Sequence, residues 1–403
     1  MLQYENYHKH SYYSNVFTPD STVSLRDYCA RAKENNQQIL STVEHGWQSN
    51  VFDALKLANE HNLKMIVGAE AYWVKDRTQS DKSNCHIILL AKNENGRRAI
   101  NDILSEANIS GFYFRPRIDI PLILSLPKDD VLVTTACVAY WKYDDIEAIT
   151  EEFKNHFGKN FYLEVQPHNN QQQMQLNKRI LELRDRLKCP IIAGIDSHYI
   201  LPQHAQMRDD FLISKQITYT DEAEWYMDYP DADTLYKRFA NQTVLTHSQI
   251  EEAMSNTLVL RDFETYDSPV FNDEIKMPTL FADKTQEERN KIYHDIIWTA
   301  WDKYKKEVPE DKWDDYEKEI KYEEQIVIDT NTADYFIDNY YIMQKGIKNG
   351  GWLTKTGRGS APSFFTNTLL GFSNIDRVSA SVHMYPDRFM STTRILQSKS
   401  LPD

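Results

Sequence analysis

Short apolar runs alternate with longer amphipathic stretches from residue 1 to about residue 200, and this alternation restricts the fold more than any other feature. The apolar runs include CHIILLA at 85–91, VLVTTAC at 131–137, FYLEV at 161–165 and CPIIAGI at 189–195. Stretches between them, such as SNVFDALKLANEHN and QMQLNKRILELRDRLK, have the apolar spacing of helices. Repeated strand–helix units build parallel sheets that helices cover. The pattern predicts an α/β fold, and its continuous apolar strands suit a barrel.

The character of the chain changes after about residue 205, where the sequence becomes polar, charged and mostly helical. The stretch WDKYKKEVPEDKWDDYEKEIKYEEQ carries opposite charges at helical spacing, which is typical of a solvated helix face. A boundary is expected near residue 262, where SNTLVLRDFETYDSPVF leads into a proline-containing extended segment. We therefore expect two domains, a barrel over residues 1–262 and a mostly helical part over residues 263–403.

Composition excludes several classes of protein. No apolar run approaches the ~20 residues that cross a bilayer, and the start lacks a signal-peptide pattern, so we expect a cytoplasmic protein without membrane partners. The four cysteines form no C-x-x-C pair, which argues against a zinc ribbon or a disulfide framework. A formal charge of -14 opposes broad attraction to nucleic acid, so any such contact must be local, metal-assisted or made by another segment.

Side chains of metal-ligand type lie beside the predicted strands. In a parallel barrel the carboxyl ends of all strands open onto one face, and this geometry would gather them. Burial of such groups is costly unless they are paired or bind an ion. They begin with an H-x-H pair, whose spacing puts both imidazoles on one face of an extended segment. The set is His8, His10, Glu44, His45, Glu70, His86, Cys137, Asp196 and His198.

Taken alone, each of these residues has an ordinary structural interpretation. A histidine is most often a hydrogen-bonded polar group, and a buried cysteine such as Cys137 is usually a small apolar side chain. The D-x-H pair of Asp196 and His198 is stronger, because it repeats the one-face spacing directly after a strand. Together the groups favour Zn²⁺, Mn²⁺ or Fe²⁺, and more than four ligands favour two or three ions, which activate a water and clamp a phosphate.

The order of these motifs resembles a known family. YHKHSYYS, STVEHG, GAEAYW, HIILLAKNENG and GIDSHY are similar to successive motifs of the polymerase and histidinol phosphatase (PHP) domain of bacterial and phage DNA polymerase III alpha subunits. The resemblance implies a seven-stranded βα barrel that binds up to three metals. It carries over as ligands His8, His10, His45, Glu70, His86, Asp196 and His198, with Cys137 at a position that is His or Cys in related domains. Asp196, His198 and His45 are the expected catalytic residues.

Three further positions follow from the same resemblance. The family has a ligand shortly after H-x-H, and Asp20 is the first candidate here, with Asn15 behind it. Glu44 stands where the family usually has aspartate. The segment GFYFRPRID also matches, which makes Arg115 and Arg117 candidate phosphate contacts, and the alternative is that they only solvate a loop.

The C-terminal part resembles the start of the polymerase III palm domain, in the segment NTADYFIDNYYIMQKGIKNGGWLTKTGRGSAPSFF. Gly357 and Gly359 let backbone N–H groups approach a nucleotide phosphate, Arg358 adds a fixed charge, and Ser360 begins the next helix. The segment RFMSTTRILQSKSLPD matches the family segment that ends in P-D-x-D-x-D, whose later two aspartates hold two Mg²⁺ ions. Asp403 is the first acid of that series.

These resemblances imply the N-terminal part of a replicative DNA polymerase III alpha-like protein, with a PHP domain over residues 1–262 and a partial palm over 263–403. They imply DNA synthesis with Mg²⁺ and dNTP in the full-length protein, together with other replisome subunits as partners. The PHP site, with Zn²⁺ or Mn²⁺, is expected to be a 3′-5′ exonuclease or phosphoesterase acting on a primer-template or a single-stranded 3′ end. A non-catalytic, metal-stabilised scaffold and a stand-alone PHP-family phosphatase remain as alternatives.

Overall fold

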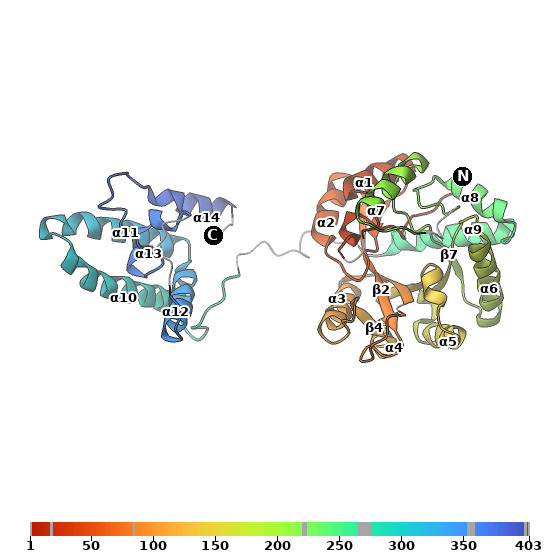
Figure 1. The fold of residues 1–403 in the computed structure, drawn as a ribbon, viewed down its shortest axis with the longest axis horizontal. Helices are drawn as coiled ribbons and strands as arrows, with labels where there is room; N and C mark the ends of the chain where they lie inside the picture. Colours follow the sequence, from red (N-terminus) through yellow and green to blue (C-terminus); the bar gives the residue numbers. More distant parts are fainter. Residues whose placement is uncertain are drawn as a thin grey trace. The chain divides into compact units, whose positions relative to one another are not determined.

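The computed structural model describes residues 2–16, 19–83, 85–219, 224–264, 276–352, 359–398 and 401. The chain divides into two compact units, Met1–Phe271 and Asn272–Asp403 (Figure 1). The division expected between residues 262 and 263 falls before this boundary, directly after the 3-10 helix η5 (Thr257–Asp262).

The first unit is built on a seven-stranded sheet in the order β1-β2-β3-β5-β6-β7, with β4 paired to β2. Strand β3 runs antiparallel to both β2 and β5, whereas the other pairs are parallel. The expectation of an all-parallel sheet was therefore wrong at β3. The reason is the short connection 75–84, which holds no helix among its described residues and cannot make the crossover that a parallel pair needs. The strands are β1 (Ile39–Thr42), β2 (Lys64–Val74), β3 (Cys85–Ala91), β4 (Arg117–Asp119), β5 (Val131–Thr135), β6 (Phe161–Val165) and β7 (Ile191–Ala193).

The N-terminal segment joins the two ends of the curled sheet. The Ser197 N–H donates to the His8 carbonyl at 3.1 Å, and the His10 N–H donates to the Ser197 carbonyl at 2.9 Å. On the other side, the Val43 N–H donates to the Lys9 carbonyl at 3.0 Å. The segment thus lies between the residues that follow β7 and those that follow β1, so that it completes the wall of a seven-stranded α/β barrel.

The strands are buried on both faces, as their continuous apolar sequences require. In β3, Ile88 and Leu90 face the barrel interior, while Ile87 and Leu89 pack toward the helices. The helices surround the sheet (Figure 1). They are α1 (Leu25–Glu34), α2 (Val51–Glu60), α3 (Glu94–Ile109), α4 (Ile120–Leu124), α5 (Ile146–Phe157), α6 (Gln171–Leu187), α7 (Ala205–Ser214), α8 (Ala232–Gln242) and α9 (His247–Asn256).

The second unit is helical in its described residues, with an aromatic core around Trp301 and Phe336. The charged helix α11 presents one buried stripe to this core, and Glu323 lies in it fully buried. The Glu323 carboxylate accepts from the backbone N–H of Phe365 and of Thr366, each at 2.7 Å, and pairs with Arg377. Its helices are α10 (Gln286–Tyr304), α11 (Trp313–Asp329), α12 (Ala333–Lys348), α13 (Phe365–Leu369) and α14 (Thr392–Ser398).

Candidate metal centre

One end of the barrel gathers the predicted ligands from separate parts of the chain. His8 and His10 lie on the N-terminal segment and Asp20 lies before α1. The others come from β2, from β3 and from the residues after β1, β5 and β7. His86 is at the beginning of β3, and the reversed direction of that strand brings it to the same end as the carboxyl ends of its neighbours. The antiparallel register pairs His86 with Tyr72, two residues beyond Glu70 on β2.

Glu70 lies at the centre of four histidines and is almost fully buried. Burial alone would raise the pKa of the Glu70 carboxyl, but the charge of His86 and the close imidazoles of His45 and His8 hold it well below its usual range. The carboxylate is therefore an anion that gathers nitrogen ligands around it. Its oxygens are 3.5 Å from His8 Nε2, 3.4 Å from His10 Nε2, 2.8 Å from His45 Nδ1 and 3.2 Å from His86 Nδ1.

Asp196 makes a second such contact set directly after β7. Its Oδ1 is 3.3 Å from His8 Nε2, 3.2 Å from His10 Nε2 and 3.6 Å from His198 Nδ1. Burial would raise the pKa of this carboxyl, but the charges of His8 and His198 hold it well below its usual range. Its backbone adopts φ of +58°, a left-handed conformation that aspartate tolerates better than most residues.

Asp20 also reaches this cluster. Its Oδ2 is 3.1 Å from His198 Nε2 and 3.8 Å from His45 Nε2, and its Oδ1 pairs with Arg208. Asn15, the reserve candidate, does something else: its Oδ1 accepts from the backbone N–H of Asp20 at 2.7 Å. Asn15 therefore shapes the loop that presents Asp20.

Cys137 lies at the edge of the cluster, with its Sγ 4.0 Å from His86 Nδ1. Burial, followed by the charges of Glu70 and Asp196, raises the pKa of its thiol well above the usual value. Three groups of described residues hold ligand atoms within 4.8 Å of one another, and neither Cys137 nor Asp20 belongs to them. The groups are His10, His45 and His198; His8, His10 and Asp196; and His45, Glu70 and His86.

The unpartnered polar atoms of the cluster test whether metal ions fit. Within the described part of the chain, these atoms are buried and have no hydrogen-bond partner. Such burial is costly unless a cation satisfies the atoms, and imidazole with carboxylate is a ligand set for Zn²⁺ or Mn²⁺. The residues therefore fit bound metal ions. The atoms are His8 Nε2, His10 Nε2, His45 Nδ1, both Glu70 oxygens, Asp196 Oδ1 and His198 Nε2.

Glu164 on β6 holds His8 in place, and it is not among the residues predicted from the sequence. Its Oε1 is 2.7 Å from His8 Nδ1 and accepts from Gln166 Nε2 at 2.8 Å, while its Oε2 accepts from the Tyr7 hydroxyl at 2.5 Å. A carboxylate on Nδ1 fixes the tautomer that leaves Nε2 free for a metal. The feature of the sequence that could have indicated this role is a glutamate within the otherwise apolar run FYLEV.

Glu44, expected among the groups of metal-ligand type, is instead a support for His10. Its carboxylate accepts from Ser11 Oγ at 2.6 Å, Ser14 Oγ at 2.5 Å and Asn50 Nδ2 at 2.7 Å. Ser14 Oγ is in turn 3.1 Å from His10 Nδ1. These donors occupy the carboxylate, and Ser14 links it to His10.

The two arginines of the GFYFRPRID segment differ in their surroundings. Arg117 is 2% exposed, and its guanidinium donates to the backbone carbonyls of Gly111, Gln79, Asp81 and Arg77 at 2.6–3.0 Å. The expectation that Arg117 contacts phosphate does not agree with this geometry, because carbonyls already occupy its donors.

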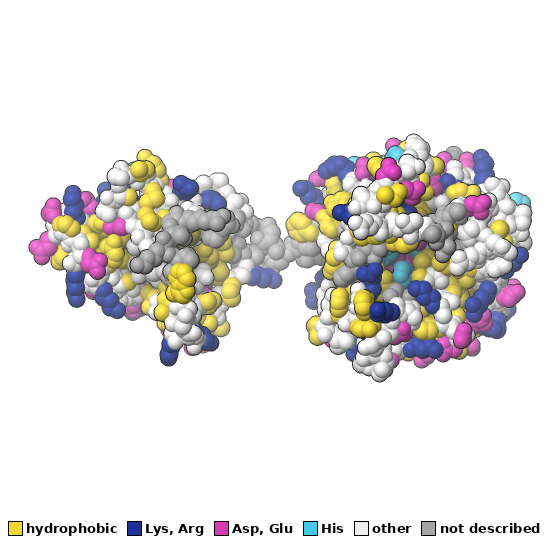
Figure 2. Space-filling model, in the orientation of Figure 1, with side chains coloured by type: hydrophobic (Ala, Val, Ile, Leu, Met, Phe, Trp, Pro, Cys, Tyr) yellow, Lys and Arg dark blue, Asp and Glu magenta, His cyan; other side chains and the backbone are white. Residues whose placement is uncertain are grey.

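Arg115 lies closer to the metal centre, over a residue that the sequence analysis missed. Its guanidinium carbon is 5.8 Å from the centroid of the Tyr72 ring. That ring is 5.1 Å from the ring of His86 and 5.9 Å from that of His45. Figure 2 shows a histidine near the middle of one face of the first unit, with lysine or arginine side chains on both sides. Through Tyr72, Arg115 thus brings a positive charge near the centre.

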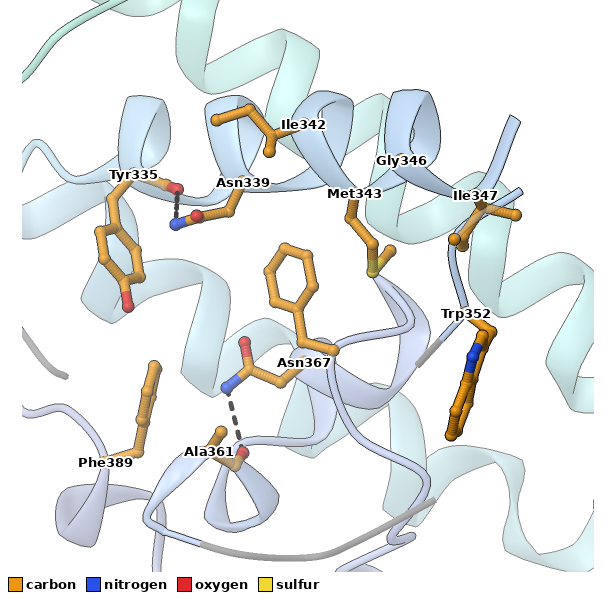
Figure 3. A pocket seen from close by; sticks show the side chains of 12 residues that line it. Tyr335, Asn339, Ile342, Met343, Gly346, Ile347, Trp352, Ala361, Asn367 and Phe389 are labelled. Carbon is orange, nitrogen blue, oxygen red and sulfur yellow. Dashed lines mark hydrogen bonds between the residues drawn. The ribbon is translucent and has the colours of Figure 1, made fainter. Parts of the chain in front are cut away.

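In the second unit, Gly357 and Arg358 of the predicted phosphate loop, and Asp403, lie outside the described residues. Gly359 has a φ of +87°, which favours glycine, and Ser360 caps a short 3-10 helix rather than beginning α13. A cavity of 590 Å³ lies beside this segment (Figure 3). Its lining includes Asn339 on α12, Trp352 and Asn367 on α13.

Among the described residues, no helix has the length and apolar character that crossing a bilayer requires.

Two families match the sequence in separate regions. The PHP domain matches residues 6–168, and the bacterial DNA polymerase III alpha NTPase domain matches residues 294–403. DNA polymerase III subunit alpha of Borreliella burgdorferi is 30% identical over 296 residues, 66% of this chain and 24% of that protein. The same subunit of Chlamydia trachomatis is 26% identical over 460 aligned positions, 98% of this chain and 36% of that protein. Among solved structures, an amidohydrolase from Chromobacterium violaceum has a TM-score of 0.33 and 14% identity, covering 48% of this chain and 87% of that one.

The first unit is therefore similar to PHP domains over residues 6–168, and the second is similar to the bacterial DNA polymerase III alpha NTPase domain over residues 294–403. The chain as a whole is similar to a part of DNA polymerase III subunit alpha. It spans only 24% and 36% of the two relatives named above, so the activity of a whole polymerase enters only as a proposal.

Proposed function

We propose that the barrel of this chain is a metal-dependent phosphoesterase that removes nucleotides from a single-stranded 3′ end. The observation that carries the proposal is the set of buried, unpartnered nitrogen and carboxylate atoms gathered around Glu70 and Asp196. Arg115, close to this set, supports phosphate rather than a neutral substrate. We keep the division into a PHP domain, residues 1–262, and a partial palm, residues 263–403, as part of this proposal.

The chain's own residues would hold and orient the reacting groups. His198 Nδ1 is 2.8 Å from the Asp196 carbonyl, and a proton on Nδ1 donated to that oxygen leaves Nε2 with a free lone pair toward the cluster. His45 Nδ1 and the Glu70 carboxylate lie 2.8 Å apart without a hydrogen-bond partner, so both could hold the same ion. Bound Zn²⁺ or Mn²⁺ would supply a water of lowered pKa and positive charge against the phosphate. Asp196, His198 and His45 are therefore our candidates for catalytic residues.

For the longer protein, we propose template-directed DNA synthesis with Mg²⁺, dNTP, primer-template DNA and replisome subunits as its ion, substrates and partners. The match of residues 294–403 supports this proposal, and Gly357, Arg358, Gly359 and Ser360 are the candidate contacts to nucleotide phosphate.

A nuclease assay with a metal count tests the barrel. The purified chain is loaded with Mn²⁺ or Zn²⁺ and incubated with a 5′-labelled single-stranded oligonucleotide, and bound metal is measured on the same sample. We expect shortening from the 3′ end, its loss with chelator, and a decrease of about 100-fold or more in Asp196→Asn. An intact oligonucleotide at full metal occupancy would support the non-catalytic scaffold instead. Hydrolysis of a small phosphate ester alone would support the stand-alone phosphatase.

A further inference from the structure

The turn 112–115 exposes aromatic side chains beside the metal centre. Phe112 is 52% exposed and Phe114 is 58% exposed. Lys82 lies over the Phe114 ring, with its Nζ 3.9 Å from the centroid. Tyr113 packs edge-to-face on Phe114 at 4.8 Å. The surface of this turn thus carries adjacent aromatic rings, with a cation over one of them.

The backbone of this turn is strained at Phe114. Its φ is +61°, a left-handed conformation that is unusual for a bulky residue. The strain is held by the hydrogen bond from the Tyr113 N–H to the Arg115 carbonyl at 3.0 Å. Such outliers cost about 1–3 kcal/mol and gather at sites that contact ligands. Glycine would remove this cost, yet the position carries phenylalanine.

The turn is fixed to the metal centre through the residues that follow it. Gly46, directly after His45, is so close to Pro116 that an added Cβ would lie 3.0 Å from the proline Cγ and 3.3 Å from the Tyr72 ring. Arg115 lies over that same ring. The position of the aromatic side chains relative to the ligands is therefore set by packed contacts rather than by a free loop.

We propose that the turn 112–115 is a binding subsite for single-stranded polynucleotide, with nucleobases stacking on Phe114 and Phe112 and the backbone phosphates meeting Lys82 and Arg115. This inference rests on the phosphoesterase function proposed above and extends it to the substrate. Stacked bases with interleaved cations are how proteins bind single strands without reading sequence. The subsite is also compatible with the net charge of -14, because local cations contact the phosphates in place of a broad basic surface.

Substitution by glycine separates binding from folding. Phe114→Gly removes the ring and relieves the left-handed strain, so we expect Tm to stay level or rise while the Kd for a single strand increases at least fivefold. Binding is measured by fluorescence anisotropy with a phosphorothioate oligothymidylate, which resists cleavage. A structural role for the ring would lower Tm instead. Tyr322→Ala, which truncates a half-exposed aromatic on α11 of the second unit, is the matched control and should leave Kd unchanged.

The cations give an independent measurement. Arg115→Gln and Lys82→Gln should each reduce the slope of log Kd against log salt by about 0.7, the value for one phosphate contact on a single strand. Unchanged Kd in Phe114→Gly, or unchanged slopes in both cation variants, would overturn the subsite. Failure of the proposed phosphoesterase function would give a different result. Neither the wild-type protein nor the variants would then cut the oligonucleotide, while the differences in Kd between them would remain.

Discussion

Replacing Glu164 by glutamine tests whether the centre depends on the carboxylate behind His8. The carboxylate contacts three groups: His8 Nδ1 at 2.7 Å, Gln166 Nε2 at 2.8 Å and the Tyr7 hydroxyl at 2.5 Å. In Glu164→Gln the side chain keeps its volume but loses the negative charge that favours a proton on Nδ1. If its oxygen stays with Tyr7, its amide N–H groups face the Nδ1 proton.

The expected loss is 10- to 100-fold in affinity for one ion, about 1.4–2.7 kcal/mol, which is the usual effect of removing a carboxylate behind a ligating histidine. The loss should be confined to the group of His8, His10 and Asp196, because the group of His45, Glu70 and His86 does not contact Glu164 in any described interaction. The measurement is competition between the protein and a chromophoric chelator for Zn²⁺. Together with the number of Zn²⁺ ions bound per chain, it separates the affinities of these two groups of ligands.

Two further variants support the interpretation. Gly194→Ala approaches the same carboxyl from the other side, since its Cβ would lie 2.1 Å from Glu164 Cδ, and should reproduce the loss without a change of charge. Glu147→Gln removes a surface carboxylate that pairs with Arg179 and should have no effect on metal. The reasoning is refuted if Glu164→Gln retains wild-type affinity for every ion, or if all ions weaken equally.

Three other predictions concern stability. Chelator should lower Tm, and Zn²⁺ at a concentration of 100 Kd should add about 2.7 kcal/mol to the free energy of unfolding. His10→Ala should lose most of this increment, and calorimetry measures both effects. Glu323→Ala should destabilise the second unit by about 3 kcal/mol in urea, followed by tryptophan fluorescence, because the buried Arg377 keeps only Glu319 and the backbone N–H groups of Phe365 and Thr366 lose their acceptor. Glu310→Ala at the surface should be neutral. Burial lowers the pKa of His168 to about 3. Below the unfolded-state pKa near 6.5, the unfolded chain therefore binds a proton that the folded chain does not, and the free energy of unfolding decreases as the pH decreases. Between pH 7.5 and 5 this residue should account for about 2 kcal/mol, and His168→Gln should remove that share; an equal pH dependence in both proteins would contradict the assignment.

The sequence was informative where spacing alone places side chains. H-x-H on an extended segment puts both imidazoles on one face whatever the rest of the fold does. Asp196 and His198 also lie close together, but the backbone of Asp196 is left-handed, so the turn after β7 brings them together rather than strand alternation. The apolar runs likewise predicted strands 85–91, 131–137 and 161–165, which the structure forms over β3, β5 and β6 within a residue or two. These are local properties, and local properties can be read from sequence.

What the sequence could not give depends on contacts between distant residues. Arg115 and Arg117 are two residues apart in one motif, and the chain turns through a left-handed conformation at Phe114 just before them. Arg117 is buried among backbone carbonyls, whereas Arg115 lies over Tyr72. The role of Glu164 depends on its pairing with His8 across the barrel. The antiparallel direction of β3 follows from a short connection whose length, rather than its residue types, decided the topology.

The position of the N-terminal segment between the ends of the sheet has a consequence for how the protein is made. The segment with His8 and His10 leaves the ribosome before Ser197, and Ser197 must be synthesised before its hydrogen bonds with His8 and His10 can form. At 5–20 residues per second this delay is roughly 10–40 s. Closure is then a contact of very large sequence separation, which makes it slow and late in folding. Until it happens, His8 and His10 lack Asp196, so the acquisition of metal marks the completion of the barrel rather than its beginning.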